Sequence, residues 1–109
     1  MSSITVNIPA TFPLNCIKGD TFVFGPYVKD VGGVDYDFTG CTATATVTLN
    51  GETIWTGSVA LDPGRMVWRI TDEATALLVA CEARYRIRVF FANGDSTSFF
   101  AGPFKISNL

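Results

Sequence analysis

Three arginines at alternate positions form the densest basic group in this 109-residue sequence. Arg84, Arg86 and Arg88 lie in the segment ARYRIRVFF, where apolar side chains fill the positions between them. If the segment is a strand, successive arginines lie about 7 Å apart on one face. Such a row can be a solvated face crossed by salt bridges, a docking surface for an acidic partner subunit, or a nucleic-acid contact. Arg65 and Arg69 join the row if the two strands share a sheet.

Enzymatic chemistry has few candidate residues here. The sequence contains no histidine, which removes the commonest general base and metal ligand. It has neither the Gly-x-Ser-x-Gly turn of many hydrolases nor a glycine-rich phosphate loop. Cys16, Cys41 and Cys81 lack the Cys-x-x-Cys spacing and are expected to stay reduced. Cys41 and Cys81 are interpreted as small apolar core residues, whereas the pattern around Cys16 leaves its role open. We therefore predict no catalytic residues, no cofactor and no enzymatic activity.

Acidic residues gather around one glycine pair. Asp30, Asp35 and Asp37 flank Gly32-Gly33, and their oxygens are of the type that calcium prefers. The spacing matches no EF-hand loop, and carboxylates in glycine turns are usually solvated, so we predict no metal site. Trp55 has two interpretations, either a core residue or an exposed anchor for a partner.

Charge is scarce in this sequence. Charged residues make up 17% of it against about 25% in typical domains, and mean hydropathy is +0.30. The net charge of −2 gives no attraction toward nucleic acid or anionic lipid. The first seventeen residues resemble neither a signal peptide nor a membrane span, so we expect synthesis in the cytoplasm, no membrane partner and no nucleic-acid partner.

The first fifteen residues differ from the rest. Ile4, Val6 and Ile8 alternate as in a strand, whereas Pro9 and Pro13 favour an extended segment without charge. Residues 1–15 are therefore either the first edge strand of their own domain or an arm that adds to a neighbouring subunit. Residues 16–109 are predicted to form a single domain.

The rest of the sequence indicates an all-β fold. TATATVTL alternates over residues 42–49 and ends in the hairpin turn Asn50-Gly51. Residues 52–59, RMVWRI, ARYRIRVFF, the segment 96–106 and TFVFGPYV supply further strands, with Gly25-Pro26 marking a bulge or an edge. Thr71 begins a helix of about two turns, in which Leu77 and Leu78 share an apolar face. We predict an antiparallel, immunoglobulin-like β-sandwich of about seven strands with one short helix.

Five motifs carry a resemblance to a known family. They are Lys18-Gly19-Asp20, Asp37-Phe38-Thr39-Gly40, the helix Thr71 to Leu78, Tyr85, and Gly102-Pro103-Phe104. In these features the chain resembles the small immunoglobulin-like domains of tailed-bacteriophage virions, in particular the N-terminal domain of baseplate upper proteins, over Lys18 to Ile106. The resemblance implies that the hydroxyl of Tyr85 returns to upstream backbone.

The resemblance also implies a function. The expected role is a non-enzymatic structural module of the virion, as an adaptor, a collar or baseplate component, or a head decoration. Its expected partners are other virion proteins and copies of itself, in the particle and in the host cytoplasm during assembly. The residues expected at partner interfaces are Ile4, Val6, Ile8, Trp55, Arg84, Arg86 and Arg88. The alternative is a small ligand- or carbohydrate-binding sandwich that uses Trp55 and the acidic loop.

Overall fold

The structure is a computed structural model that describes residues 10–108. Within this range, strands contain 60% of the chain and helix 5%, which confirms the predicted all-β class. The strands are β1 (Ala10–Thr11), β2 (Leu14–Ile17), β3 (Phe22–Phe24), β4 (Thr42–Leu49), β5 (Glu52–Asp62), β6 (Arg65–Ile70), β7 (Cys81–Phe90) and β8 (Ser96–Ser107), and the helix is α1 (Asp72–Ala76).

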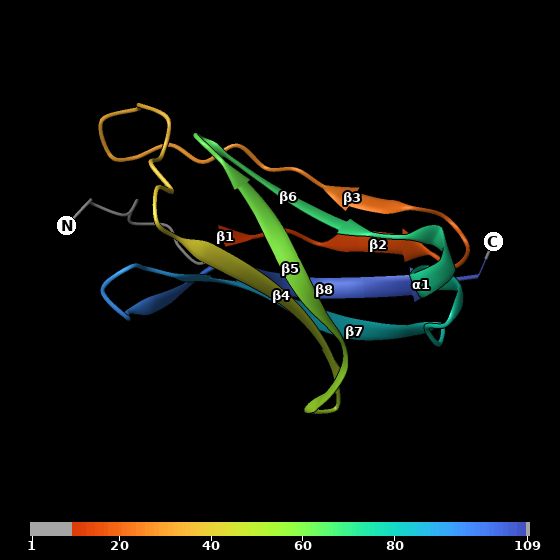
Figure 1. Ribbon diagram of the computed structural model, residues 1–109. Helices are drawn as coiled ribbons and strands as arrows, with labels where there is room; N and C mark the ends of the chain where they lie inside the picture. Colours follow the sequence, from red (N-terminus) through yellow and green to blue (C-terminus); the bar gives the residue numbers. More distant parts are fainter. Residues whose placement is uncertain (1–9, 109) are drawn as a thin grey trace.

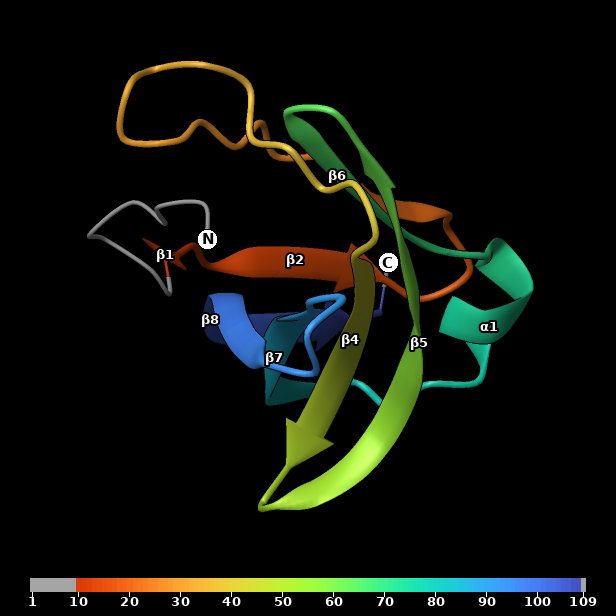
Figure 2. The same ribbon diagram turned by 60° about the vertical axis from the view of Figure 1, so that its left-hand side comes forward.

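The strands form one curled sheet that folds over its own core. Its order is β1-β8-β7-β4-β5-β6-β3, and β2 also pairs with β8. The layer that contains β8, β7 and β4 faces the layer that contains β6 and β3, as both ribbon views show (Figures 1 and 2). The long strand β5 pairs with β4 through Glu52 to Val59 and with β6 through Ala60 to Asp62. Because this strand joins the two layers, the fold is a half-barrel rather than two separate sheets.

The start of the described chain lies along the last strand. Both β1 and β2 pair with β8, and both pairs are parallel. The prediction of a wholly antiparallel sheet is therefore wrong at this edge. Parallel strands need a long connection between them, and here the rest of the domain, from β3 to β7, forms that connection. Residues 10–15 thus form an edge of their own domain.

Local sequence patterns account for the central hairpin. On β4, Ala43, Ala45 and Val47 are buried while the threonines between them face outward, as the alternation predicts. Asn50 and Gly51 have φ angles of 52° and 82°, the left-handed conformation that a two-residue hairpin turn needs. The turn therefore fixes the pairing of β4 with β5.

The helix is shorter than predicted. Thr71 is its N-cap, and its Oγ1 accepts a hydrogen bond from the Ala74 amide at 3.2 Å. The chain leaves the helix after Ala76, and Leu77 is 86% exposed instead of lying on an apolar face. Thr75 is the buried residue of the helix, and its hydroxyl donates to the Asp20 carbonyl at 2.8 Å. This bond attaches the helix to the turn between β2 and β3.

Aromatic rings fill the space between the layers. Trp68 on β6 is fully buried, and its ring lies 5.3 Å from Phe104 on β8 and 4.9 Å from Phe22 on β3, measured between centroids. The ring of Tyr85 on β7 lies 5.7 Å from that of Trp68, again between centroids.

Within residues 10–108, no helix is long and apolar enough to cross a membrane.

Tyr85 also attaches the first strands to the sheet. Its hydroxyl donates to the Phe12 carbonyl at 2.9 Å, across 73 residues of sequence. The expected return of this hydroxyl to upstream backbone is therefore observed. Gly102, which pairs with Tyr85, permits the approach, because a Cβ at this position would lie 3.0 Å from the same carbonyl oxygen.

Replacement of Tyr85 by phenylalanine tests this contact. Tyr85→Phe leaves the Phe12 carbonyl without its donor, and we expect it to lower the free energy of unfolding by about 1–2 kcal/mol at pH 7.5. Burial raises the pKa of Tyr85 above its ordinary value of 10.0. The wild-type contribution is therefore complete below pH 10 and is lost as the pH rises toward the folded-state pKa.

Urea unfolding of the wild type and of Tyr85→Phe, at pH 7.5 and above pH 10, measures the difference in their free energies of unfolding. Burial also raises the pKa values of the Cys16 and Cys41 thiols, but both proteins contain these thiols, so their titration does not change the difference. The gap in stability between wild type and Tyr85→Phe should narrow at the higher pH. A gap that widens there would contradict the assignment.

Candidate functional site

The arginine row lies on the outer face of the curled sheet. Arg84 and Arg86 are exposed and Arg88 is half-buried, whereas Tyr85, Ile87 and Val89 between them are buried. The face therefore follows from the period of two in the sequence. On β4 the threonines Thr48, Thr46 and Thr44 pair with these arginines in that order.

Serine hydroxyls on β8 hold two of the guanidinium groups. The Nε of Arg86 donates to the Oγ of Ser98 at 2.5 Å, and an Nη of Arg88 donates to the Oγ of Ser96 at 2.9 Å. The Arg88 guanidinium also lies 5.6 Å from the ring centre of Phe90. The Nε of Arg88 is buried and has no acceptor among residues 10–108. These contacts orient the cationic groups without neutralising them.

No ion pair neutralises this charge within the described part of the chain, although Glu82 occupies the next alternate position on β7. Arg84, Arg86 and Arg88 make no ion pair with any residue between 10 and 108. Together with Thr46 and Thr48 they line a shallow depression of about 390 Å³. The interpretation as a face crossed by salt bridges therefore has no support in this range, and the row offers unpaired cations to a partner.

The other two arginines do not extend the row. Their strand β6 belongs to the same curled sheet as β7, but β4 and β5 lie between the two strands, so Arg65 and Arg69 do not lie beside the row. Arg65 instead lies over the Tyr27 ring, 5.2 Å from its centre. The two strands alternate in the same way, but they belong to opposite layers.

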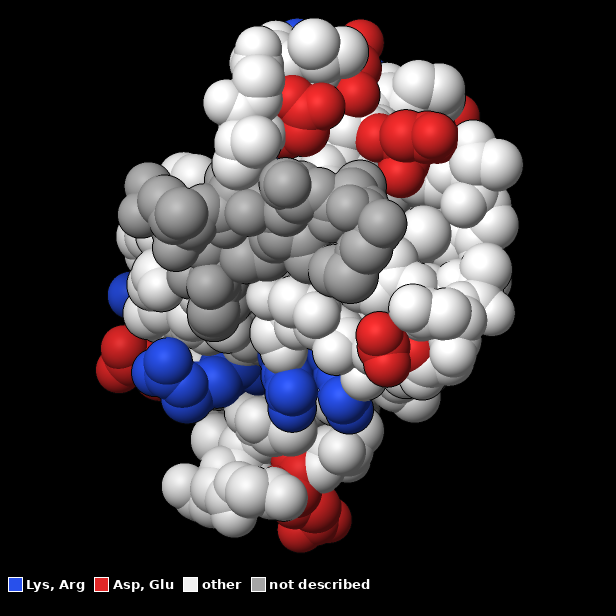
Figure 3. Space-filling model, turned by 90° about the vertical axis from the view of Figure 1, so that its left-hand side faces the viewer, with Lys and Arg blue, Asp and Glu red and all other residues white. Residues whose placement is uncertain are grey.

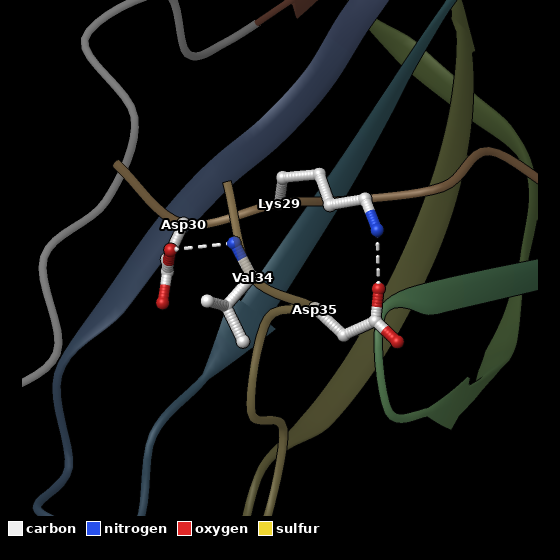
Figure 4. A network of polar contacts seen from close by, with 4 residues as sticks. All are labelled: Lys29, Asp30, Val34 and Asp35. Atoms are coloured by element: carbon white, nitrogen blue, oxygen red, sulfur yellow. Dashed lines mark hydrogen bonds and ion pairs between the residues drawn. The ribbon is translucent and has the colours of Figure 1, made fainter. Parts of the chain in front are cut away.

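The acidic loop uses its carboxylates locally (Figure 4). Asp35 forms an ion pair with Lys29 at 2.5 Å, and Asp30 accepts hydrogen bonds from the amides of Gly32 and Val34 at 2.8 and 3.1 Å. Asp37 accepts from the hydroxyl and the amide of Thr39, and these bonds lower the pKa of the Asp37 carboxyl. Among residues 10–108, no group of three or more carboxylate or thiol side chains is placed to hold a metal ion.

Three carboxylates from separate segments form what we call the acidic rim, defined as Asp37, Asp62 and Asp95. Asp37 and Asp62 line a depression of about 180 Å³, and Asp37 and Asp95 line a neighbouring one of about 430 Å³. None of the three forms an ion pair with a residue in the described range. The rim is therefore an anionic surface at the loop end of the domain.

Trp55 belongs to the core side of β5. It pairs with the buried Val47, is half-buried, and lies 5.9 Å from Trp68 between ring centroids. Gly57 makes room for its indole, because a Cβ there would lie 2.5 Å from the ring. This packing supports the interpretation of Trp55 as a core residue rather than an exposed anchor. Ile4, Val6 and Ile8 lie outside the described residues.

Sequence reasoning missed several members of this surface. Ser96 and Ser98 orient arginines, and Asp62 and Asp95 belong to the acidic rim. Alternation along the predicted last strand does not reveal the serines, because an unbroken period of two would place them on the buried face of Phe100. A β-bulge opposite Ile87 and Arg88 shifts the register and turns them outward. Nothing in the sequence pattern brings Asp62 and Asp95 near Asp37, since Asp62 ends β5 and the other two lie in separate loops.

Comparison with known proteins shows a likeness of fold to solved structures. No protein-family model matches the chain, and no curated protein matches it. The fold is similar to part of a crystal structure from Bacteroides vulgatus described as a putative glycoside hydrolase, with a TM-score of 0.54 and 18% sequence identity. The match covers 88% of this chain and 16% of that one. At this identity the likeness shows the fold alone.

Proposed function

We propose that this protein is a non-enzymatic structural module that acts through protein–protein contacts, as a component of a tailed-bacteriophage virion. The observation that carries the proposal is the row of Arg84, Arg86 and Arg88, whose charges have no carboxylate partner among residues 10–108. Arginines without an ion-pair partner on a sheet face can bind an acidic protein surface, because complementary charge selects and orients the partner.

The chemistry of the described residues supports a binding role. The carboxylates of Asp30 and Asp35 are occupied by contacts within their own loop, Asp37 accepts hydrogen bonds from Thr39 but forms no ion pair in the described range, and the sequence supplies no histidine. Burial raises the pKa of the Cys16 and Cys41 thiols, which disfavours the reactive thiolate. The described residues therefore fit a binding surface better than a catalytic site.

The virion assignment rests on the family resemblance of the sequence. The all-β fold and the contact from Tyr85 to upstream backbone agree with that resemblance. In this role the protein is an adaptor, a collar or baseplate component, or a head decoration, and its partners are other virion proteins and copies of itself. It would be found in the particle and, during assembly, in the host cytoplasm.

A second candidate is a carbohydrate- or small-ligand-binding module. The observation that favours it is the likeness to part of a protein described as a putative glycoside hydrolase. In this candidate a sugar would bind in the depression of about 430 Å³ that Asp37, Asp95, Phe91 and Asn93 line. This candidate requires neither the arginine row nor a particle.

Mass spectrometry of purified particles tests the virion proposal. We expect the chain in particles from the source that encodes it, at a fixed ratio to the other structural proteins. The variant Arg84→Glu/Arg86→Glu should be incorporated at about a tenth of the wild-type level or less, because reversed charge repels an acidic partner. Arg69→Glu, on β6, is the matched control and should be incorporated normally.

Two results would contradict the proposal. One is the absence of the chain from particles that are otherwise complete. The other is a purified protein that binds glycans on an array and keeps that binding in Arg84→Glu/Arg86→Glu, which would favour the second candidate.

A further inference from the structure

The arginine row and the acidic rim are opposite in charge and similar in size. The row presents Arg84, Arg86 and Arg88, and the rim presents Asp37, Asp62 and Asp95. Neither set is neutralised by ion pairs within residues 10–108, where the ion pair of Lys29 with Asp35 involves neither set. One molecule thus carries two unpaired surfaces that complement each other.

The two surfaces cannot satisfy one another within a single chain. The row lies on the outer face of β7, flanked by the threonines of β4. Asp37 and Asp95 lie in loops, and Asp62 is the last residue of β5, opposite Arg65 on β6. Lys and Arg side chains form a row across one side of the molecule, and acidic side chains lie above it, below it and at both of its ends (Figure 3). Both signs of charge are therefore exposed toward the same side.

Charges arranged in this way suit a symmetric pair of molecules. When two copies face each other across a two-fold axis, the row of each copy can meet the rim of the other, and the same contact forms twice. A head-to-tail contact between two copies would use the row of one and the rim of the other once and leave one surface of each sign unpaired, whereas the two-fold pair uses all four surfaces. Arginine is suited to this contact because its planar group forms paired hydrogen bonds with carboxylates.

We propose that the partner of the arginine row is the acidic rim of a second copy of this chain, in a two-fold symmetric dimer. The inference rests on the proposed function, because it names one of the contacts through which such a module assembles. The row and the rim together form the interface, with the serine-held guanidinium groups of Arg86 and Arg88 as its oriented donors.

Sedimentation velocity of the purified full chain tests the dimer. We expect a monomer–dimer equilibrium whose dissociation constant rises about tenfold or more between 50 mM and 500 mM NaCl, because exposed ion pairs are screened by salt. Arg84→Glu/Arg86→Glu should weaken the dimer by at least about tenfold, because attraction becomes repulsion. Asp62→Lys/Asp95→Lys should weaken it by a similar factor, and it leaves the Asp37–Thr39 contact in place.

Mixing the two variants gives the decisive measurement. Each variant alone carries two surfaces of the same sign, so each should remain monomeric. In an equimolar mixture every row meets a rim of opposite sign, and we expect a heterodimer of wild-type affinity. Glu73→Lys on α1, at the other end of the molecule, is the control for net charge and should dimerise like the wild type.

Several outcomes would overturn the inference. They are a wild type that stays monomeric at millimolar concentration, a dimer that is unchanged in both variants, and a mixture that fails to associate. Circular dichroism of each variant confirms that it is folded. A monomeric protein that is still incorporated into particles through its arginines would refute the dimer and leave the proposed function intact. Binding of a single-stranded oligonucleotide by the row, in place of dimerisation, would also refute it.

Discussion

Replacement of Trp68 by alanine is expected to lower the free energy of unfolding by about 3–5 kcal/mol. The indole is fully buried at the centre of the half-barrel and contacts aromatic rings from both layers. Its removal leaves a cavity that the surrounding strands cannot close, because β5 joins the layers on one side and fixes their spacing. For a domain of this size such a loss is a large fraction of the total stability.

Urea unfolding followed by circular dichroism measures this loss. Trp68→Phe is the matched control, since it keeps a ring in the site and removes the indole Nε1, which is buried without an acceptor in the described range. The phenylalanine variant should lose markedly less stability than the alanine variant, because an unsatisfied buried donor is itself unfavourable. Equal losses in the two variants would show that ring packing at this position is not what holds the layers together.

Deletion of residues 2–15 is expected to lower stability by several kcal/mol, or to prevent folding altogether. The deletion removes β1 and the first half of β2, which are the described neighbours of β8 on its outer edge. It also removes the Phe12 ring, which lies 5.9 Å from Phe100 and 6.2 Å from Phe24, and the carbonyl that accepts from Tyr85. Apolar surface on β8 would then face water.

Deletion of residues 2–9 is the matched comparison. It leaves the pairing of β1 and β2 with β8 and the Tyr85–Phe12 hydrogen bond unchanged. We therefore expect a smaller change in melting temperature than for the longer deletion. If Ile4, Val6 and Ile8 contact partner subunits, as predicted, this shorter deletion should reduce incorporation into particles. Equal melting temperatures for the two deletions, with normal incorporation, would assign these residues to the core of their own domain.

Sequence alone determined the parts of the fold that depend on near neighbours. The alternation of residues 42–49 and 65–70 defines the buried faces of β4 and β6, and the conformational freedom of Asn50-Gly51 defines the turn between β4 and β5. Thr71 determined where the helix begins, because a cap needs only the next turn of the chain. The outward face of the arginine row followed from the same period of two.

Tertiary structure decided everything that depends on which segments meet. The end of the helix depended on the hydrogen bond of Thr75 to Asp20, some fifty-five residues away, which the apolar period of Leu77 and Leu78 does not reveal. The parallel pairing of β1 and β2 with β8 joins the two ends of the sequence, and no local pattern encodes it. Arg65 and Arg69 alternate like the row on β7, yet pairing places them in the other layer.

The candidate interaction surface was likewise determined partly by local sequence and partly by tertiary structure. Its cations lie on one strand and were visible as a spacing, whereas its anions come from two loops and the end of β5. Asp37, Asp62 and Asp95 are brought to neighbouring depressions only by the curl of the sheet. A period of two fixes the direction of side chains along one strand, but closeness between strands is set by pairing and packing across the whole chain, which single-strand patterns do not contain.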